Sequence, residues 1–364
     1  MVGRASPPQI DLARLDFLRG IAAVYVVLNH VRGSFYAGGQ KIMAGSHSLF
    51  DTVAVALLQG TALGAEAVIL FFVLSGFAMA HSIQRSRGAA GFYLRRIVRI
   101  WPPYIAATLF ALAVGRLVGI DEIERYLIQI LFYISPGRAL VPQFWSLPYE
   151  VLFYLLCPLI LANRRAVHWT GGAAVVLTAI TIGAKGITLN PYPSFFANFF
   201  GNELLLFAAG ALTFYHADRV PSMSGRALAI AAVLLFVAAW ALKWQVGASN
   251  FLSNLAMIAM AVLAIRNLPD RIVGYRPLNW GFFSYSIYIF HYALIEVARW
   301  CFIRFAGYSP AEIRNPFAWM LVVPVVLGAC FLLYLVSERP ANALVARLRR
   351  RGTTAGAAPA GAGG

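Results

Sequence analysis

Apolar runs separated by short polar, arginine-rich segments recur along almost the whole chain. Most of these runs approach or reach the ~20 residues that a membrane-spanning helix needs. The runs that this pattern predicts as helices are 15–34, 52–82, 98–118, 146–162, 170–188, 201–216, 227–244, 251–265, 280–303 and 317–337. The predicted fold is therefore all-α, a polytopic membrane bundle of about ten transmembrane helices.

Basic residues give this bundle an orientation, because arginine and lysine favour the cytoplasmic side of a membrane. With ten spans, the side that carries both termini receives more basic residues than the other, so the N- and C-termini are predicted to be cytoplasmic. The amphipathic segment 121–135 is assigned to the membrane interface or a re-entrant helix, since an added span there would reverse every later loop. The predicted division is a cytoplasmic lead at 1–14, a membrane domain at 15–340, and a basic, then disordered cytoplasmic tail at 341–364.

Composition supports the membrane class. The chain has 364 residues, of which 60% are hydrophobic and 12% charged, about half the charged fraction of a soluble domain. A net charge of +16 would suit a nucleic-acid partner, but the basic residues lie between apolar runs and at the ends, so no such partner is expected. The three cysteines have no paired spacing, which predicts neither a metal site nor a disulfide framework.

Ionisable residues inside the apolar runs point to function, because each costs at least a few kcal/mol at mid-bilayer unless it meets a partner or water. The first run contains Arg19 and His30, eleven positions apart. At 100° per residue both project from one helix face, about 16 Å apart along the axis. A purely structural interpretation has equal weight. In it, Arg19 reaches the lipid headgroups and His30 makes an interhelical hydrogen bond.

Arg96 and Arg99 lie three residues apart at the cytoplasmic mouth of the third run, just before a Pro-Pro pair. Loading of the inner loops with positive charge explains Arg96 well and Arg99 less well, because Arg99 lies deeper. Two arginines at such a mouth can also hold the phosphates of a nucleotide-like ligand. In the second run, Glu66 is predicted to be the buried partner of an arginine, and Ser75-Gly76 is predicted to serve close helix packing.

Two later runs carry further polar residues. Glu150 lies about 8 Å inside the fourth run from the outer side, at a depth comparable with His30. His291 lies near mid-membrane on the ninth run, with Tyr285 and Tyr288 one turn apart before it. A lone buried histidine is more often structural than catalytic, so both readings of His291 stay open.

Six blocks of sequence together resemble the acyltransferase-3 family of integral-membrane acyltransferases. The blocks are Arg19-x10-His30, Phe71-Phe72-Val73-Leu74-Ser75-Gly76-Phe77, Arg96-x2-Arg99-Ile100 with Pro103-Tyr104, Trp145-Ser146-Leu147-x2-Glu150-x2-Phe153-Tyr154, Ser284-Tyr285-x2-Tyr288-x2-His291, and Glu338-Arg339-Pro340. They span residues 15–340 in the family's order. Many members carry a carboxylate directly before the Phe-Phe-Val block. Here that place is apolar, and Glu66, one turn earlier, is the candidate substitute.

The resemblance implies transfer of an acyl group, commonly acetyl, from cytoplasmic acyl-CoA to a hydroxyl of an extracytoplasmic saccharide or lipid-linked glycan, in a bacterial inner membrane and without a metal. In this reading His30 is the general base, and Glu150 orients His30 or an acceptor hydroxyl. Arg19, Arg96, Arg99 and Tyr104 bind the donor, while the supporting polar network comprises Glu66, Ser146, Tyr285, Tyr288 and His291. An acyl-histidine intermediate is an alternative mechanism, and a transporter with an intramembrane polar pathway is the alternative function.

Overall fold

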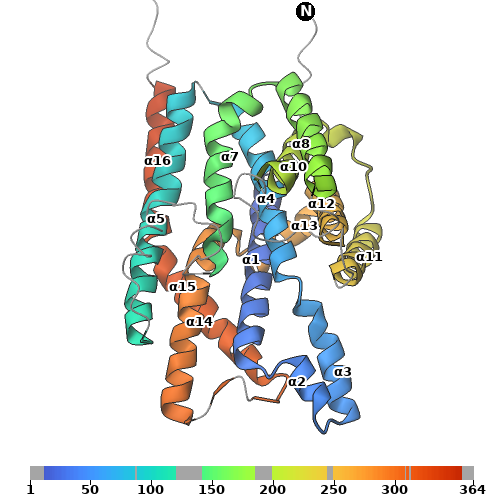
Figure 1. The fold of residues 1–364 in the computed structure, drawn as a ribbon. Coiled ribbons are helices and arrows are strands. Elements are labelled where there is room, and N and C mark those ends of the chain that lie inside the picture. Colours follow the sequence, from blue (N-terminus) through green and yellow to red (C-terminus); the bar gives the residue numbers. More distant parts are fainter. Residues whose placement is uncertain are drawn as a thin grey trace, which may run out of the picture.

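The structure, a computed structural model, is a bundle of helices whose long members run roughly side by side (Figure 1). It describes residues 12–86, 88–119, 142–184, 199–243, 249–307, 309–310 and 313–354. Within these ranges every regular element is helical, as the apolar pattern predicts. The predicted interfacial segment 121–135 lies outside the described residues.

Most of the helices overlap the predicted apolar runs. The helices are α1 (Leu12–Phe35), α2 (Gly39–Ala44), α3 (Leu49–Leu58), α4 (Gly64–Gln84), α5 (Ala89–Leu117), α7 (Leu147–Ile160), α8 (Arg164–Ala184), α10 (Leu204–Tyr215), α11 (Gly225–Lys243), α12 (Ser249–Asn267), α13 (Asp270–Val273), α14 (Ser284–Ala306), α15 (Val322–Val336) and α16 (Glu338–Thr354). Of these, α2, α13 and α16 lie outside the predicted runs. A π-helical turn at Phe199–Glu203 precedes α10.

The predicted run 52–82 is not one helix, because it breaks between α3 and α4. Helix α3 begins with a capping box in which Ser48 and Asp51 satisfy each other's backbone N–H groups. At the break, the Asn29 side chain donates a 2.7 Å hydrogen bond to the carbonyl of Thr61, and Tyr25 donates one of 2.7 Å to the carbonyl of Gly60. Polar side chains of α1 thus satisfy carbonyls that a continuous helix would have satisfied itself.

Fewer helices meet simple criteria for crossing a membrane than the predicted number of spans. Five helical stretches in the described ranges are long and apolar enough: Leu49–Gln84, Ala89–Leu117, Gly225–Lys243, Gly281–Ala306 and Ala318–Val336. Two shorter apolar helices cover Phe199–Tyr215 and Phe251–Asn267. The described part of the chain is therefore all-helical, with several candidate membrane-spanning helices.

Helices α1, α4 and α14 form the centre of the bundle, and α10 crosses α4 at very short range. Small residues make this crossing close. A Cβ on Gly76 of α4 would overlap the carbonyl of Phe207, and a Cβ on Gly210 of α10 would overlap the carbonyl of Val73. Gly76 therefore serves close helix packing, as its position beside Ser75 predicts.

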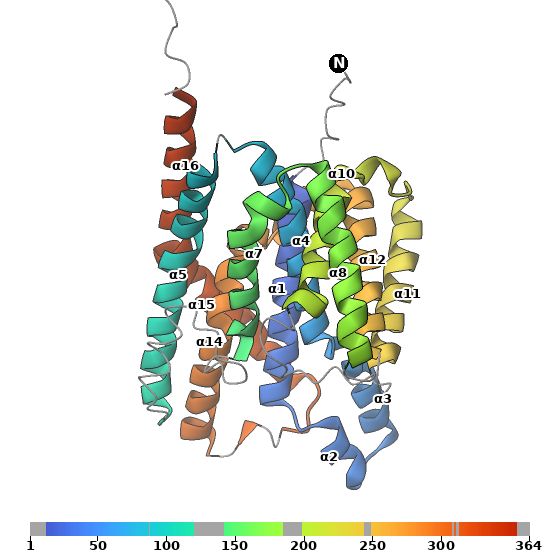
Figure 2. The ribbon, with the colours of Figure 1, turned by 45° about the horizontal axis from the view of Figure 1, so that its top comes forward.

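The packed part of the chain continues beyond residue 340, where the sequence pattern placed the start of a tail. Helix α16 runs along α5 (Figure 2), and its Ala341 and Val345 side chains are buried. Glu338, at its first residue, is also buried and accepts hydrogen bonds of 2.9 and 2.7 Å from the backbone N–H and hydroxyl of Ser286. The start of α1 and the end of α16 lie at the same end of the bundle.

Candidate active site

A cavity of about 570 Å³ lies among α1, α4, α5, α7 and α14. It reaches residues at the end of the bundle where α1 begins and α16 ends, including Leu12 and Leu348. Its charged lining is mostly basic: the arginines are Arg19, Arg85, Arg95, Arg96 and Arg99. The acidic side chains that share this lining are Asp16 and Glu150. We call it the arginine-lined cavity.

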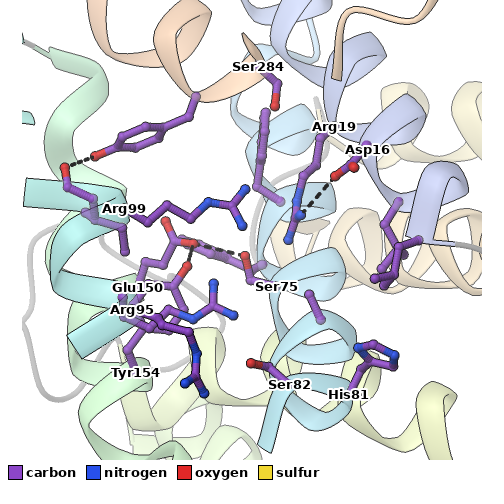
Figure 3. A pocket seen from close by; sticks show the side chains of 18 of the residues that line it. Asp16, Arg19, Ser75, His81, Ser82, Arg95, Arg99, Glu150, Tyr154 and Ser284 are labelled. Atoms are coloured by element: carbon purple, nitrogen blue, oxygen red, sulfur yellow. Dashed lines mark hydrogen bonds and ion pairs between the residues drawn. The ribbon is translucent and has the colours of Figure 1, made fainter. Parts of the chain in front are cut away.

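The arginines reach the cavity from different helices. Arg19 on α1 and Arg99 on α5 enter the same space from opposite sides (Figure 3). Arg19 lies 3.6 Å from the Asp16 carboxylate, and its Nη2 donates to the carbonyl of Leu74 at 3.5 Å. Arg96 lies 5.6 Å from the centroid of the Tyr154 ring, within cation–π range. The three arginines proposed from the sequence thus line one cavity.

Two further arginines of the cavity, Arg85 and Arg95, are not singled out by the sequence pattern, because both fit loading of an inner loop with positive charge. Arg95 donates a 2.7 Å hydrogen bond to the hydroxyl of Ser86, which holds its side chain toward the cavity. Arg95 precedes Arg99 by one helical turn. This i, i+4 spacing on the helix is the available signal that the two share a face.

Glu150 belongs to this cavity. One of its carboxylate oxygens accepts a 3.0 Å hydrogen bond from Ser75 and a second hydrogen bond from Tyr154 (Figure 3). The sequence predicts for Glu150 a depth comparable with that of His30, yet its hydrogen-bond partners in the described structure do not include that histidine. Ser75, interpreted from the sequence as a packing residue, is therefore also a polar ligand of this carboxylate.

Three more predicted residues, Ser146, Tyr285 and Tyr288, line the cavity. The Ser146 and Tyr288 hydroxyl oxygens are 2.6 Å apart, and Tyr288 donates to the carbonyl of Gln143 at 2.5 Å. Tyr285 donates to the carbonyl of Ile100 at 3.2 Å. Each hydroxyl is thus held against α5 or the turn that leads into α7. The polar groups of this wall of the cavity, formed by Ser146, Tyr285 and Tyr288, therefore have hydrogen-bond partners within the protein.

Beside this wall lie two histidines that the sequence separates by most of the chain. Nδ1 of His30 on α1 is 2.8 Å from Nε2 of His291 on α14, and the two ring planes are within 14° of each other, with centroids 5.1 Å apart. His291 is fully buried, whereas His30 is half-buried. The Tyr288 ring, which lines the cavity, is 6.2 Å from that of His291. Tyr288 therefore connects the arginine-lined cavity to the histidine pair.

The lining of the cavity does not include His30 and His291 themselves, and two further predicted residues, Tyr104 and Glu66, also lie outside it. Tyr104 is buried outside the cavity lining and packs against Phe144, with ring centroids 5.3 Å apart. Glu66 is buried near the start of α4, and its ion-pair partner among the described residues is a lysine: Nζ of Lys243 on α11 lies 2.9 Å from its Oε2. The prediction of an arginine partner is wrong, because the packing of α11 against the start of α4 places the lysine that ends α11 at this carboxylate.

No group of three or more histidine, cysteine or acidic side chains within the described ranges is arranged to hold a metal ion. Those ranges instead contain a basic cavity, a carboxylate held by hydroxyls and a pair of imidazoles. Such a set of groups suits binding of an anionic ligand and proton transfer at a nearby imidazole.

Comparison with known proteins identifies the class. The sequence model of the acyltransferase-3 family, described as an acyltransferase domain, matches residues 12–335. The chain is 27% identical to acyltransferase MdmB of Streptomyces mycarofaciens over 94% of this chain and 95% of that protein. It is 26% identical to nodulation protein 10 of Rhizobium leguminosarum bv. viciae, over 76% of this chain and 82% of that protein. No solved structure matches. The chain belongs to the acyltransferase-3 family and is an acyltransferase.

Proposed function

We propose that this enzyme is a membrane O-acyltransferase that moves an acyl group, acetyl being the simplest case, from cytoplasmic acyl-CoA to a hydroxyl of an extracytoplasmic or exported saccharide. The observation that carries the proposal is the juxtaposition of two parts. The arginine-lined cavity opens toward one end of the bundle, and the His30–His291 pair lies beside Tyr288, which lines that cavity.

The cavity suits the nucleotide end of coenzyme A. Guanidinium groups bind phosphate oxygens through paired, charge-assisted hydrogen bonds, and Arg19, Arg96 and Arg99 converge on one space from two helices. The helix-rise distance of about 16 Å from Arg19 to His30 along α1 is comparable with the reach of a pantetheine arm. A donor held by its phosphates can therefore extend its thioester toward Tyr288 and the histidine pair.

The proposed membrane orientation places the cavity mouth in the cytoplasm. In it, α1, α4, α5, α7, α8, α10, α11, α12, α14 and α15 provide ten spans in a bacterial inner membrane. The basic mouth then lies on the side that positive-inside loading favours, where acyl-CoA is present. The start of α1 and the end of α16, which share one end of the bundle, lie on that side as well.

In the proposed reaction, His30 removes the proton of the acceptor hydroxyl as the hydroxyl oxygen attacks the thioester carbonyl. Glu150, held by Ser75 and Tyr154, orients polar groups of the bound substrates rather than the His30 ring. Glu66 and Tyr104 support the fold around the site, since the first is paired with Lys243 and the second packs on Phe144.

Binding of the donor alone tests the proposal while the acceptor is still unidentified. Purified enzyme is titrated with coenzyme A, and the dissociation constant is compared for wild type, Arg99→Ala and Arg165→Ala. Arg165 is a matched control, because it is exposed near the start of α8 and does not line the cavity. Loss of a charged hydrogen bond of about 1.5–3 kcal/mol predicts about tenfold to hundredfold weaker binding for Arg99→Ala only. Equal affinity in all three proteins would overturn the donor site.

A further inference from the structure

We infer that His291 is a positioning residue that fixes the tautomer of His30, so that Nδ1 of His30 carries the proton and Nε2 carries the basic lone pair. The inference deepens the proposed function and rests on its assignment of His30 as the base. The sequence suggested the carboxylate of Glu150 as the group that orients His30. In the present inference, that role belongs to the imidazole of His291.

The argument starts from the backbone of α14. Nδ1 of His291 lies 2.9 Å from the carbonyl oxygen of Ile287 and 2.9 Å from that of Tyr288. A carbonyl oxygen only accepts hydrogen bonds, so Nδ1 of His291 must carry a hydrogen. The two carbonyls therefore determine where the proton of this ring resides.

The next step follows from the state of the second nitrogen. His291 is fully buried, and charging a buried imidazole that has no anionic partner is costly. The described partners of its ring are two carbonyls and His30, none of them an anion. The ring is therefore neutral, and a neutral ring with a proton on Nδ1 presents a lone pair at Nε2.

That lone pair faces Nδ1 of His30 at 2.8 Å. Two lone pairs at this distance would repel each other, so Nδ1 of His30 must donate a hydrogen bond to His291. His30 then holds its basic lone pair on Nε2, away from its partner. Free imidazole side chains favour the opposite tautomer, with the proton on Nε2, so the pair imposes the form that can act as a base there.

This arrangement accounts for every proton in the proposed step. Nε2 of His30 takes the proton of the acceptor hydroxyl while the new ester C–O bond forms. The C–S bond of the thioester then breaks, and the departing sulfur takes that proton from Nε2, which gives free coenzyme A and returns His30 to its starting form. Throughout, Nδ1–H of His30 donates to His291, and this hydrogen bond strengthens while His30 is cationic.

Two substitutions of His291 separate positioning from packing. In His291→Gln the side-chain amide oxygen can accept from Nδ1–H of His30, whereas His291→Phe keeps a ring but offers no acceptor. The tautomer is read directly from the ring ¹⁵N chemical shifts of histidine-labelled protein, with the His30 signals assigned by their loss in His30→Ala. We expect the Nδ1–H tautomer of His30 in wild type and His291→Gln, and a shift toward Nε2–H in His291→Phe.

Turnover gives a second readout, measured as coenzyme A released from acetyl-CoA in the presence of membranes from a strain that lacks the enzyme. His291→Phe should lower the rate at saturating acetyl-CoA at least tenfold with an unchanged KM for acetyl-CoA, and His291→Gln should recover most of the rate. An Nε2–H tautomer in wild type, or equal losses in both variants, would overturn the inference. If His30→Ala kept full turnover, the proposed function would fail while the tautomer result stood on its own.

Discussion

Lys243 at the end of α11 forms a largely buried ion pair with Glu66 near the start of α4, with 2.9 Å between Nζ and Oε2. The same ammonium group donates a 2.8 Å hydrogen bond to the carbonyl of Ala62, just before α4. The pair therefore connects α11 to the α3–α4 break and satisfies a backbone carbonyl there. Its position outside the arginine-lined cavity assigns it to stability rather than to ligand binding.

Glu66→Gln should destabilise the protein, because it leaves the Lys243 charge without its carboxylate. Removing one partner of a fully buried pair costs about 3–5 kcal/mol. Since the lysine side chain is 23% exposed, we expect a loss of about 2–3 kcal/mol, seen as a lower thermal midpoint in detergent. The double variant Glu66→Gln/Lys243→Met should be closer to wild type. An unchanged midpoint for Glu66→Gln would contradict the structural role.

The α4–α10 crossing should be sensitive to a single methyl group. Gly76→Ala places a Cβ against the carbonyl of Phe207, so the helices must separate, at a cost of about 1–3 kcal/mol. Gly328→Ala on α15 is the matched control, because a Cβ there has no heavy atom within 4 Å. Thermal unfolding of the two variants should show a lower midpoint for Gly76→Ala only. Equal midpoints would show that the crossing tolerates expansion.

Local periodicity predicts most of the long helices, because each apolar run is long and its ends are marked by charged or small residues. It misses the break inside 52–82 and the packed helix α16. Periodicity also predicts a shared face for Arg19 and His30, since both lie on one helix. The same reasoning detects Arg96 and Arg99, whose depth in the membrane is readable from the sequence. These predictions depend only on neighbours along the chain.

Contacts between distant segments cannot be read in this way. The pairing of His30 with His291 requires α1 and α14 to lie side by side, and no local pattern encodes that. The same holds for Lys243, which appears in the sequence as an ordinary charge at the end of an apolar run. Tyr104 shows a related limit: its motif suggests donor contact, whereas its ring packs against Phe144 from a neighbouring segment.

The Tyr154 ring should matter more for donor binding than its hydroxyl, because the ring lies under the guanidinium of Arg96. Tyr154→Leu removes a cation–π contact of about 0.5–2 kcal/mol and should weaken coenzyme A binding by roughly 2- to 30-fold. Tyr154→Phe keeps the ring and loses only the hydrogen bond to Glu150. Titration of the two variants with coenzyme A should therefore find near wild-type affinity for Tyr154→Phe. Equal weakening of both would assign the effect to the hydroxyl instead.

Ser75 and Glu150 offer a test of the carboxylate itself. Glu150→Gln keeps the shape of the side chain but removes the charge that accepts from Ser75 and Tyr154. Charge-assisted hydrogen bonds are about twice as strong as neutral ones, so acyl transfer should fall about tenfold or more. Release of coenzyme A from acetyl-CoA measures the loss, and Ser75→Ala should show a smaller one. A fully active Glu150→Gln enzyme would remove Glu150 from the site.

The imidazole of His30 is the centre of the proposed mechanism, and its role can be tested in cells without a purified acceptor. Mass spectrometry of surface glycans, compared between a strain lacking the enzyme and its parent, identifies the acylated product. The deletion strain is then complemented with wild type, His30→Ala or His47→Ala. His47 is the matched control, because it is exposed and lies outside the His30–His291 pair.

With equal protein levels in the membrane, the proposed mechanism predicts that wild type and His47→Ala restore the acyl group. His30→Ala should lower the rate of acylation at least a hundredfold, about the lower end of what a general base contributes, and should still bind coenzyme A. Full restoration of glycan acylation by His30→Ala would contradict it.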